Sequence, residues 1–144
     1  MDPGPRDYAA TVSAGGISWM RAAFVWMLTM IVETGHGAVR EVFIAPVLGD
    51  LRARQLGVLV GSLIVLAIAW LFRRWWQPAT RGEQLAIGAF WLALTLVFEF
   101  SLGRATGVSW SRLLSDYDPA QGGFMLLGVA VMFFAPRWVS TWSR

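Results

Sequence analysis

Four apolar stretches alternate with short polar segments along the chain. They cover residues 18–45, 55–72, 84–102 and 123–142. At about 1.5 Å per helical residue, each stretch approaches the thickness of the hydrocarbon core of a bilayer. The pattern therefore predicts an all-α, polytopic membrane protein, a bundle of about four transmembrane helices built by one domain over residues 17–144. The polar residues 1–16 are predicted to be a disordered or surface-lying tail.

A shorter element is predicted between the third and fourth spans. Apolar residues recur at helical spacing between residues 108 and 117, with Arg112 and Asp116 on the opposite side. This spacing is typical of a short amphipathic helix lying on the membrane interface. The fourth span contains Pro136, and we expect a kink there.

Polar residues interrupt the first span, and two interpretations follow. In one, a single long helix passes through Glu33, Gly35 and Gly37 and stops at Pro46. In the other, the glycines break the helix, and residues 39–48 form a short interfacial or re-entrant helix. We favour the long helix, because its polar residues then fall on one side.

The composition supports a membrane protein and excludes several chemistries. Hydrophobic residues make up 56% of the chain and charged residues 15%, which leaves more apolar surface than a particle of 144 residues can bury. The sequence has no Cys and no Lys, which excludes thiolate and Schiff-base chemistry. We expect no cofactor and no metal, and we do not interpret the net charge of +3 as nucleic-acid binding, because most arginines flank the apolar stretches.

The distribution of arginines predicts the orientation. With four spans, seven arginines lie on the side of the two termini and five on the other side. Positively charged residues favour the cytoplasmic side, so both termini are predicted to be cytoplasmic. All twelve basic residues are Arg and there is no Asn, which fits a GC-rich genome and places the chain in a bacterial inner membrane.

Ionisable residues within the spans are the candidates for function. Trp26, Thr29, Glu33, His36 and Arg40 fall on one stripe of the first helix, and Glu41 lies to one side of it. Such a stripe must face protein or water, because lipid does not solvate charge. The sequence therefore predicts an ion, proton or polar-ligand site in which the carboxylates titrate, the imidazole relays protons and the guanidinium holds the site together.

The third span is predicted to complete this site. Glu99 lies about as deep along the third span as Glu33 along the first, and Arg104 follows it as Arg40 follows Glu33. A further four residues are predicted to line a pocket, namely Trp26, Thr29, Trp91 and Thr95. The alternative is a buried, fully paired polar cluster that only fixes the packing of the helices.

Gly57 and Gly61 form a small-xxx-small motif on the second span. Such motifs allow close approach of helices, either within one chain or between two copies.

Three classes of function remain open. The first is a small transporter or channel that uses Glu33, His36 and Glu99. The second is a non-catalytic accessory or scaffold subunit of a membrane complex, and the third, a membrane enzyme acting on a lipid or quinone, is the weakest because no nucleophile–base pair is complete. The expected partners are the lipid bilayer and either further copies of the chain or a larger membrane complex.

Overall fold

The structure is a computed structural model that describes residues 16–76 and 80–142, and every regular element in these ranges is helical. The all-α prediction is therefore confirmed. The predicted tail lies, apart from Gly16, outside the described residues. In chain order the elements are α2 (Trp19–Val39), η1 (Arg40–Ile44), α3 (Ala45–Leu48), α4 (Asp50–Leu71), α5 (Arg73–Trp76), α6 (Arg81–Ala105), α7 (Trp110–Ser115), η2 (Pro119–Gln121) and α8 (Met125–Thr141).

Three helices are long and apolar enough to cross a membrane. They are Trp19–Leu48, Asp50–Leu71 and Arg81–Ala105. The fourth apolar helix, α8, has 17 residues and is shorter than the other three. A short helix, α7, lies between α6 and α8 in chain order.

The first helix is continuous through Gly35 and Gly37, as in the interpretation that we favoured. It ends at Leu48 rather than before Pro46, and Gly49 stops it with a positive φ of 84°. The chain accommodates Pro46 by widening into one π-helical turn, in which the Ala45 N–H donates to the carbonyl of Arg40. Proline lacks an N–H and its ring crowds the carbonyl four residues earlier, so a wider turn before it relieves the clash.

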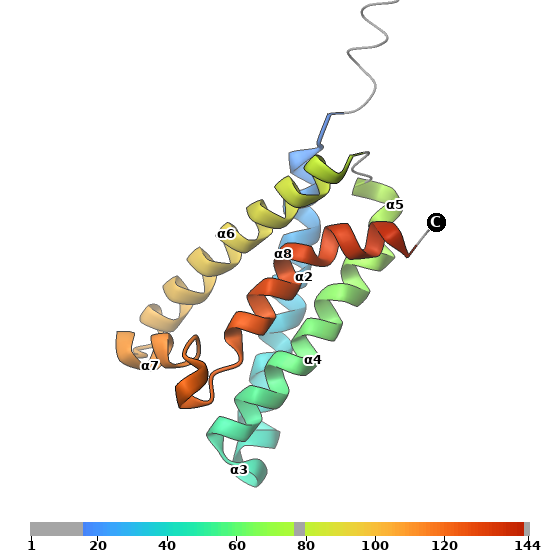
Figure 1. Cartoon of the computed structure of the whole chain (residues 1–144). Coiled ribbons are helices and arrows are strands. Elements are labelled where there is room, and N and C mark those ends of the chain that lie inside the picture. Colours follow the sequence, from blue (N-terminus) through green and yellow to red (C-terminus); the bar gives the residue numbers. More distant parts are fainter. Residues whose placement is uncertain (1–15, 77–79, 143–144) are drawn as a thin grey trace, which may run out of the picture.

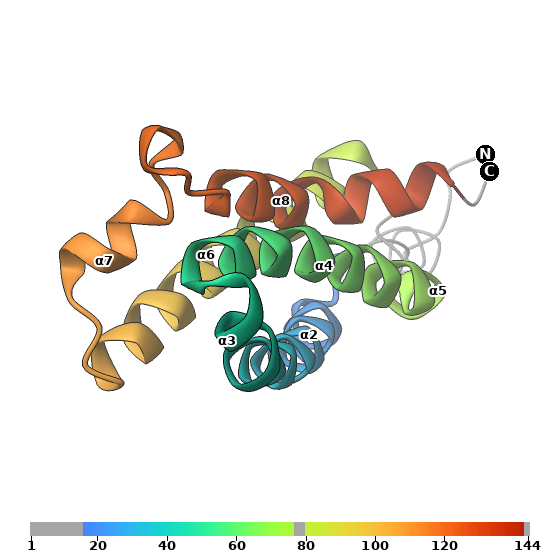
Figure 2. The same cartoon turned by 90° about the horizontal axis from the view of Figure 1, so that it is seen from below.

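The long helices form a bundle in which α8 packs on both α4 and α6, and α2 packs on the same two helices from the other side. Short connections make successive helices antiparallel, so α2 and α6 run in the same direction (Figure 1). The start of α2 and the end of α8 lie at one end of the bundle. At the other end, α7 and its turns extend to one side, away from α2 (Figure 2).

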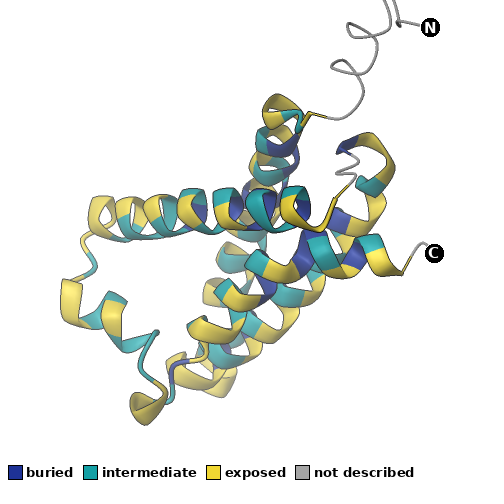
Figure 3. Ribbon diagram, turned by 45° about the horizontal axis from the view of Figure 1, so that its top comes forward, coloured by how far each residue is buried: buried dark blue, intermediate teal, exposed yellow. Residues whose placement is uncertain are grey.

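The helices are apolar on both their inner and outer faces. On α4 the buried residues stand four apart along the whole helix and are mostly small, namely Ala53, Gly57, Gly61, Val65 and Ala69. The outward faces carry large apolar side chains, such as Leu63 and Val97, which are each 67% exposed. Figure 3 shows the buried residues confined to the inner sides of the bundle. A surface of this kind is solvated by lipid rather than water.

The tryptophans divide between the surface and the core. Trp19, Trp75, Trp110, Trp138 and Trp142 are exposed near helix ends, where aromatic side chains meet a membrane interface. Trp76, in contrast, is buried against Trp91, with the two ring centroids 5.5 Å apart.

The helices α6 and α8 approach each other closely at Gly88 of α6. A methyl group at this position would overlap the carbonyl oxygen of Phe133 on α8, and would lie 2.9 Å from its carbonyl carbon. The adjoining part of α8 contains Pro136, and Figure 1 shows the helix changing direction along its length, as the kink prediction expects. Gly88 is therefore required for the backbone of α8 to rest directly on α6.

We predict that Gly88→Ala destabilises the protein by about 1–3 kcal/mol or more, because a backbone carbonyl cannot move aside without displacing a helix. In a domain of this size this lowers Tm by about 2–4 °C per kcal/mol. The measurement is a thermal scan of Trp fluorescence in detergent. Gly37→Ala is the matched control, because a methyl group there meets no described atom within 4 Å. Equal Tm values for the two variants would contradict the close packing of α6 on α8.

Candidate polar site between the helices

The buried side of α2 continues into a polar stripe. Ala22, Val25 and Thr29 are buried on this side, and one and two turns further along stand Glu33 and His36. Their side chains are each 20% exposed, and Glu33 Oε2 lies 3.4 Å from His36 Nδ1. The same helical repeat that buries the apolar residues therefore directs a carboxylate and an imidazole into the bundle.

Gly57 and Gly61 of α4 provide the space into which this stripe packs. A methyl group on Gly61 would lie 2.8 Å from Glu33 Oε2, and one on Gly57 would lie 2.9 Å from Arg40 Cδ. Both glycines are buried against side chains of the same chain. The small-xxx-small motif thus serves packing within the chain, and it places a carboxylate and a guanidinium on the backbone of α4.

Glu99 of α6 joins this group from the opposite side. Its charge interacts with those of Glu33 and Arg40, and also with that of Asp116 beyond α7. Within the described residues, Glu33 Oε1 and Arg40 Nε are buried without a hydrogen-bond partner. We call Glu33, His36, Arg40 and Glu99 the interhelical polar site.

Two predicted members lie apart from the interhelical polar site. Glu41 is 65% exposed, with its carboxylate 3.8 Å from the guanidinium of Arg40. Arg104 is exposed at the end of α6, where it donates to the carbonyl of Val108 and lies 5.3 Å from the ring centroid of Trp110. Its role is to fasten the turn after α6 rather than to accompany Glu99.

The four predicted pocket-lining residues form part of the packed contact between α2 and α6. Trp26 Nε1 donates to Thr95 Oγ1 over 3.0 Å, and Trp91 Nε1 donates to the carbonyl of Ala22 over 2.9 Å. Thr29 donates to the carbonyl of Val25 within its own helix. These side chains satisfy one another, so they hold α2 against α6 instead of lining an open space.

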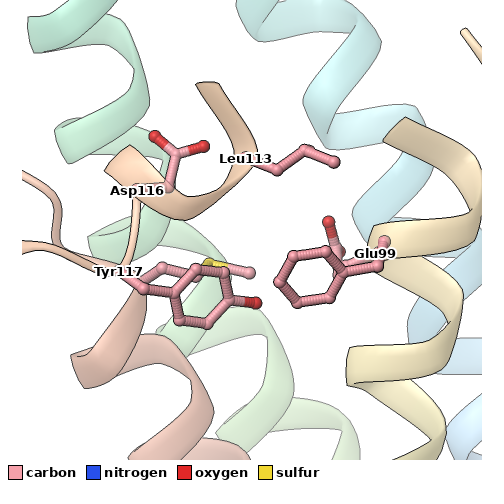
Figure 4. Close-up of a pocket in the computed structure, with 6 residues that line it drawn as sticks. Glu99, Leu113, Asp116 and Tyr117 are labelled. Carbon is pink, nitrogen blue, oxygen red and sulfur yellow. The ribbon is translucent and has the colours of Figure 1, made fainter. Parts of the chain in front are cut away.

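A small cleft lies next to Glu99, toward the end of the bundle where α7 is. It is lined by Glu99, Phe100, Leu113, Asp116, Tyr117 and Met125, and its volume of about 30 Å³ is comparable to that of one water molecule. Figure 4 shows the Tyr117 hydroxyl directed toward the side on which Glu99 lies, whereas the Asp116 carboxylate is directed away. We call this space the α7 cleft.

The sequence-based prediction missed a group of paired charges beside this cleft. Asp50 and Arg54 at the start of α4 meet Arg112 and Asp116 around α7, and each carboxylate contacts both guanidinium groups. Arg54 Nε lies 3.0 Å from Asp50 Oδ2, and Arg112 Nη2 lies 3.3 Å from the same oxygen. We call these four residues the α4–α7 charge network. The predicted topology already put them on one side of the membrane, which was the available signal.

Tyr117 has a raised pKa of about 12, against an ordinary value of 10.0. Burial of the phenol is the largest cause, and the charges of Glu99 and Asp116 add to it. Its hydroxyl has no hydrogen-bond partner among the described residues. The phenol therefore keeps its proton at any physiological pH.

No three His, Asp or Glu side chains come together as metal ligands in the described part of the chain.

Comparison of the chain with protein-family models, with curated proteins and with solved structures gives no match.

We predict that Tyr117 ionises near pH 12 in the folded protein. The sequence holds two tyrosines, so in Tyr8→Phe the phenol of Tyr117 is the only one, and ultraviolet absorbance against pH reports it directly. Because the folded pKa is raised, this group stabilises the fold below pH 10, and that contribution is lost between about pH 10 and 12. The same titration after unfolding gives the reference curve. A folded-state midpoint near 10 would contradict the burial of the phenol.

Proposed function

We propose that this chain is a small bacterial inner-membrane protein that moves protons, alone or coupled to a small solute, through the interhelical polar site. The supporting observation is the arrangement of Glu33 and Glu99, two carboxylates on different helices whose charges act on each other and on a single arginine, Arg40. The site thus combines ionisable side chains from two neighbouring helices, α2 and α6.

Charge balance explains why such a site would handle protons. Two ionised carboxylates and one guanidinium carry a net negative charge, and lipid-embedded protein tolerates uncompensated charge poorly. The group becomes neutral when one proton is held by a carboxylate or by the imidazole of His36. The imidazole of His36 stands 3.4 Å from Glu33, within reach for exchanging a proton with that carboxylate. The site is therefore suited to take up and release one proton.

We further propose that α8 is the fourth span and that the N-terminus and the C-terminus both face the cytoplasm. At about 1.5 Å per residue, α8 covers about 25 Å, which is close to the hydrocarbon thickness when the flanking residues are included. In this orientation α7 lies at the periplasmic interface, and the exposed tryptophans fall near the two membrane surfaces.

We predict that the protein, reconstituted into liposomes that contain a pH-sensitive dye, passes protons when a membrane potential is imposed, and that Glu33→Gln lowers this flux by about tenfold or more. The substitution removes a proton acceptor from the path. A tenfold loss of flux corresponds to an increase of about 1.4 kcal/mol in the activation free energy of proton transfer. The initial rate of dye response is the measurement.

Glu41→Gln is the matched control for this experiment. It makes the same chemical change on the same helix, but at a carboxylate that is 65% exposed and outside the interhelical polar site. We expect it to keep the wild-type flux. Wild-type liposomes with no flux above protein-free liposomes would overturn the proposal, and the polar group would then be the packing device of an accessory subunit.

The topology is tested separately. We predict that a reporter that functions only in the cytoplasm, fused to the C-terminus, is active, because four spans return the chain to the side on which it started. A fusion placed after Ala105, following the third span, should behave in the opposite way. If the C-terminal reporter behaves as a periplasmic fusion, the chain crosses the membrane three times and α8 is not a transmembrane helix.

A further inference from the structure

We call residues 108–121, which contain α7, the α7 segment. This segment is attached to the bundle in a way that differs from the other helices. α7 has six residues and none of them is buried. It is connected to α6 through Gly107 and to α8 through Gly122, and both glycines have positive φ angles, of 85° and 79°. Glycine adopts such angles without strain, so the two connections are formed by the residue type that best permits a change of direction.

The contact of this segment with α6 is made mainly by flat aromatic faces. The ring of Phe100 stacks on Trp110 at 5.8 Å and on Tyr117 at 5.5 Å, with interplanar angles of 27° and 17°. Leu113 adds one apolar contact, because its side chain lies directly over Gly103. Stacked rings and a single leucine restrain a segment less than the interlocked side chains of a helix core do.

A further attachment, beside the hydrogen bond from Gln55 Nε2 to the carbonyl of Gly122, is the α4–α7 charge network. Arg112 and Asp116 from the α7 segment contact Asp50 and Arg54 of α4, so every ion pair between the two segments depends on these four side chains. The side chains of Arg54 and Asp116 are 17% and 30% exposed. Ion pairs that are partly shielded from water are stronger than fully exposed ones, and a network restrains its members jointly.

Beneath this segment lies the α7 cleft, with Glu99 in its lining. Leu113, Asp116 and Tyr117 of the α7 segment form one side of the cleft, and Glu99 and Phe100 of α6 form the other side (Figure 4). Displacement of the α7 segment would therefore widen the cleft directly above Glu99.

We infer that the α7 segment is a hinged cover over a route by which water and protons reach Glu99 from this end of the bundle, and that the α4–α7 charge network is the latch that keeps it closed. The role of the route in proton movement rests on the proposed function. The cover and its latch stand on the geometry of the segment alone.

The absence of Cys from the sequence gives a direct test. Met125 lines the cleft, so Met125→Cys introduces a single thiol beneath the cover. The detergent-solubilised protein is treated with a water-soluble methanethiosulfonate reagent, and modification is followed by mass spectrometry. We expect Arg54→Gln, which removes one guanidinium of the latch, to speed the modification by about tenfold, a change that corresponds to about 1.4 kcal/mol of opening free energy.

Matched controls separate opening of the cover from other effects. Arg52→Gln makes the same change two residues away, at an exposed arginine that forms no ion pair within the described residues, and we expect it to leave the rate unchanged. A thiol at Leu114, which is 55% exposed on α7, should react at one rate in all backgrounds. Arg112→Gln provides a second way of breaking the latch if Arg54→Gln lowers Tm. Equal rates for Met125→Cys with the latch intact and broken in either way would overturn the inference.

Proton flux through liposomes, measured on the same variants without the added thiol, then distinguishes the two proposals. Faster labelling together with faster flux in Arg54→Gln supports both. If Arg54→Gln speeds the thiol modification but the protein passes no protons, the hinged cover is supported and the proposed function is contradicted. If proton flux depends on Glu33 but the rate of thiol modification is the same with the latch intact and broken, the proposed function is supported and the hinged cover is contradicted.

Discussion

The interior of this bundle is organised by the need to place charged side chains where lipid cannot reach them. Glu33 and Arg40 stand on a helix whose outer side is apolar, so they must turn toward the bundle. A carboxylate and a guanidinium need room there, and α4 provides it by having Gly61 and Gly57 at the two contact positions. The rotation of α2 about its axis is thereby fixed. The same rotation brings Trp26 to Thr95 and Ala22 to Trp91, at earlier turns on the same side of α2.

Charge is used differently at the end of the bundle that carries α7. There, Asp50, Arg54, Arg112 and Asp116 contact one another in an alternating arrangement, so each charge has two partners of opposite sign. In the interhelical polar site, Glu33 and Glu99 face a single Arg40, and two buried polar atoms have no described partner. A saturated set of ion pairs holds segments together, whereas an unsaturated set invites a proton or a polar ligand. This contrast is the reason to assign function to the interior group and a structural role to the peripheral one.

The features that local periodicity controls were predictable from the sequence, and those that depend on contacts between distant segments were not. The apolar repeat gave the helices, and the positions of Glu33, His36 and Arg40 on one side of α2 followed from the same repeat. Arg104 could not be placed in this way, because its partner Val108 lies in a turn whose path the repeat does not describe. The burial of Trp76 depends likewise on a distant residue, because its ring packs against Trp91 of α6. The end of the first helix was misjudged because one π turn allows a helix to continue past a proline.

Glu99 connects the interhelical polar site with the α7 cleft, since its charge interacts inward with Glu33 and Arg40 and outward with Asp116. Tyr117 stands between the outer pair, with a hydroxyl that faces the Glu99 side of the cleft and keeps its proton because its pKa is about 12. A phenol that stays protonated can donate a hydrogen bond to a carboxylate or to a water next to it without exchanging charge. The polar residues therefore form a graded sequence, from fully paired charges at the surface, through a neutral hydroxyl, to incompletely paired carboxylates in the interior. Under the proposed function, such an order would give protons a path from this end of the bundle to Glu99 through the α7 cleft.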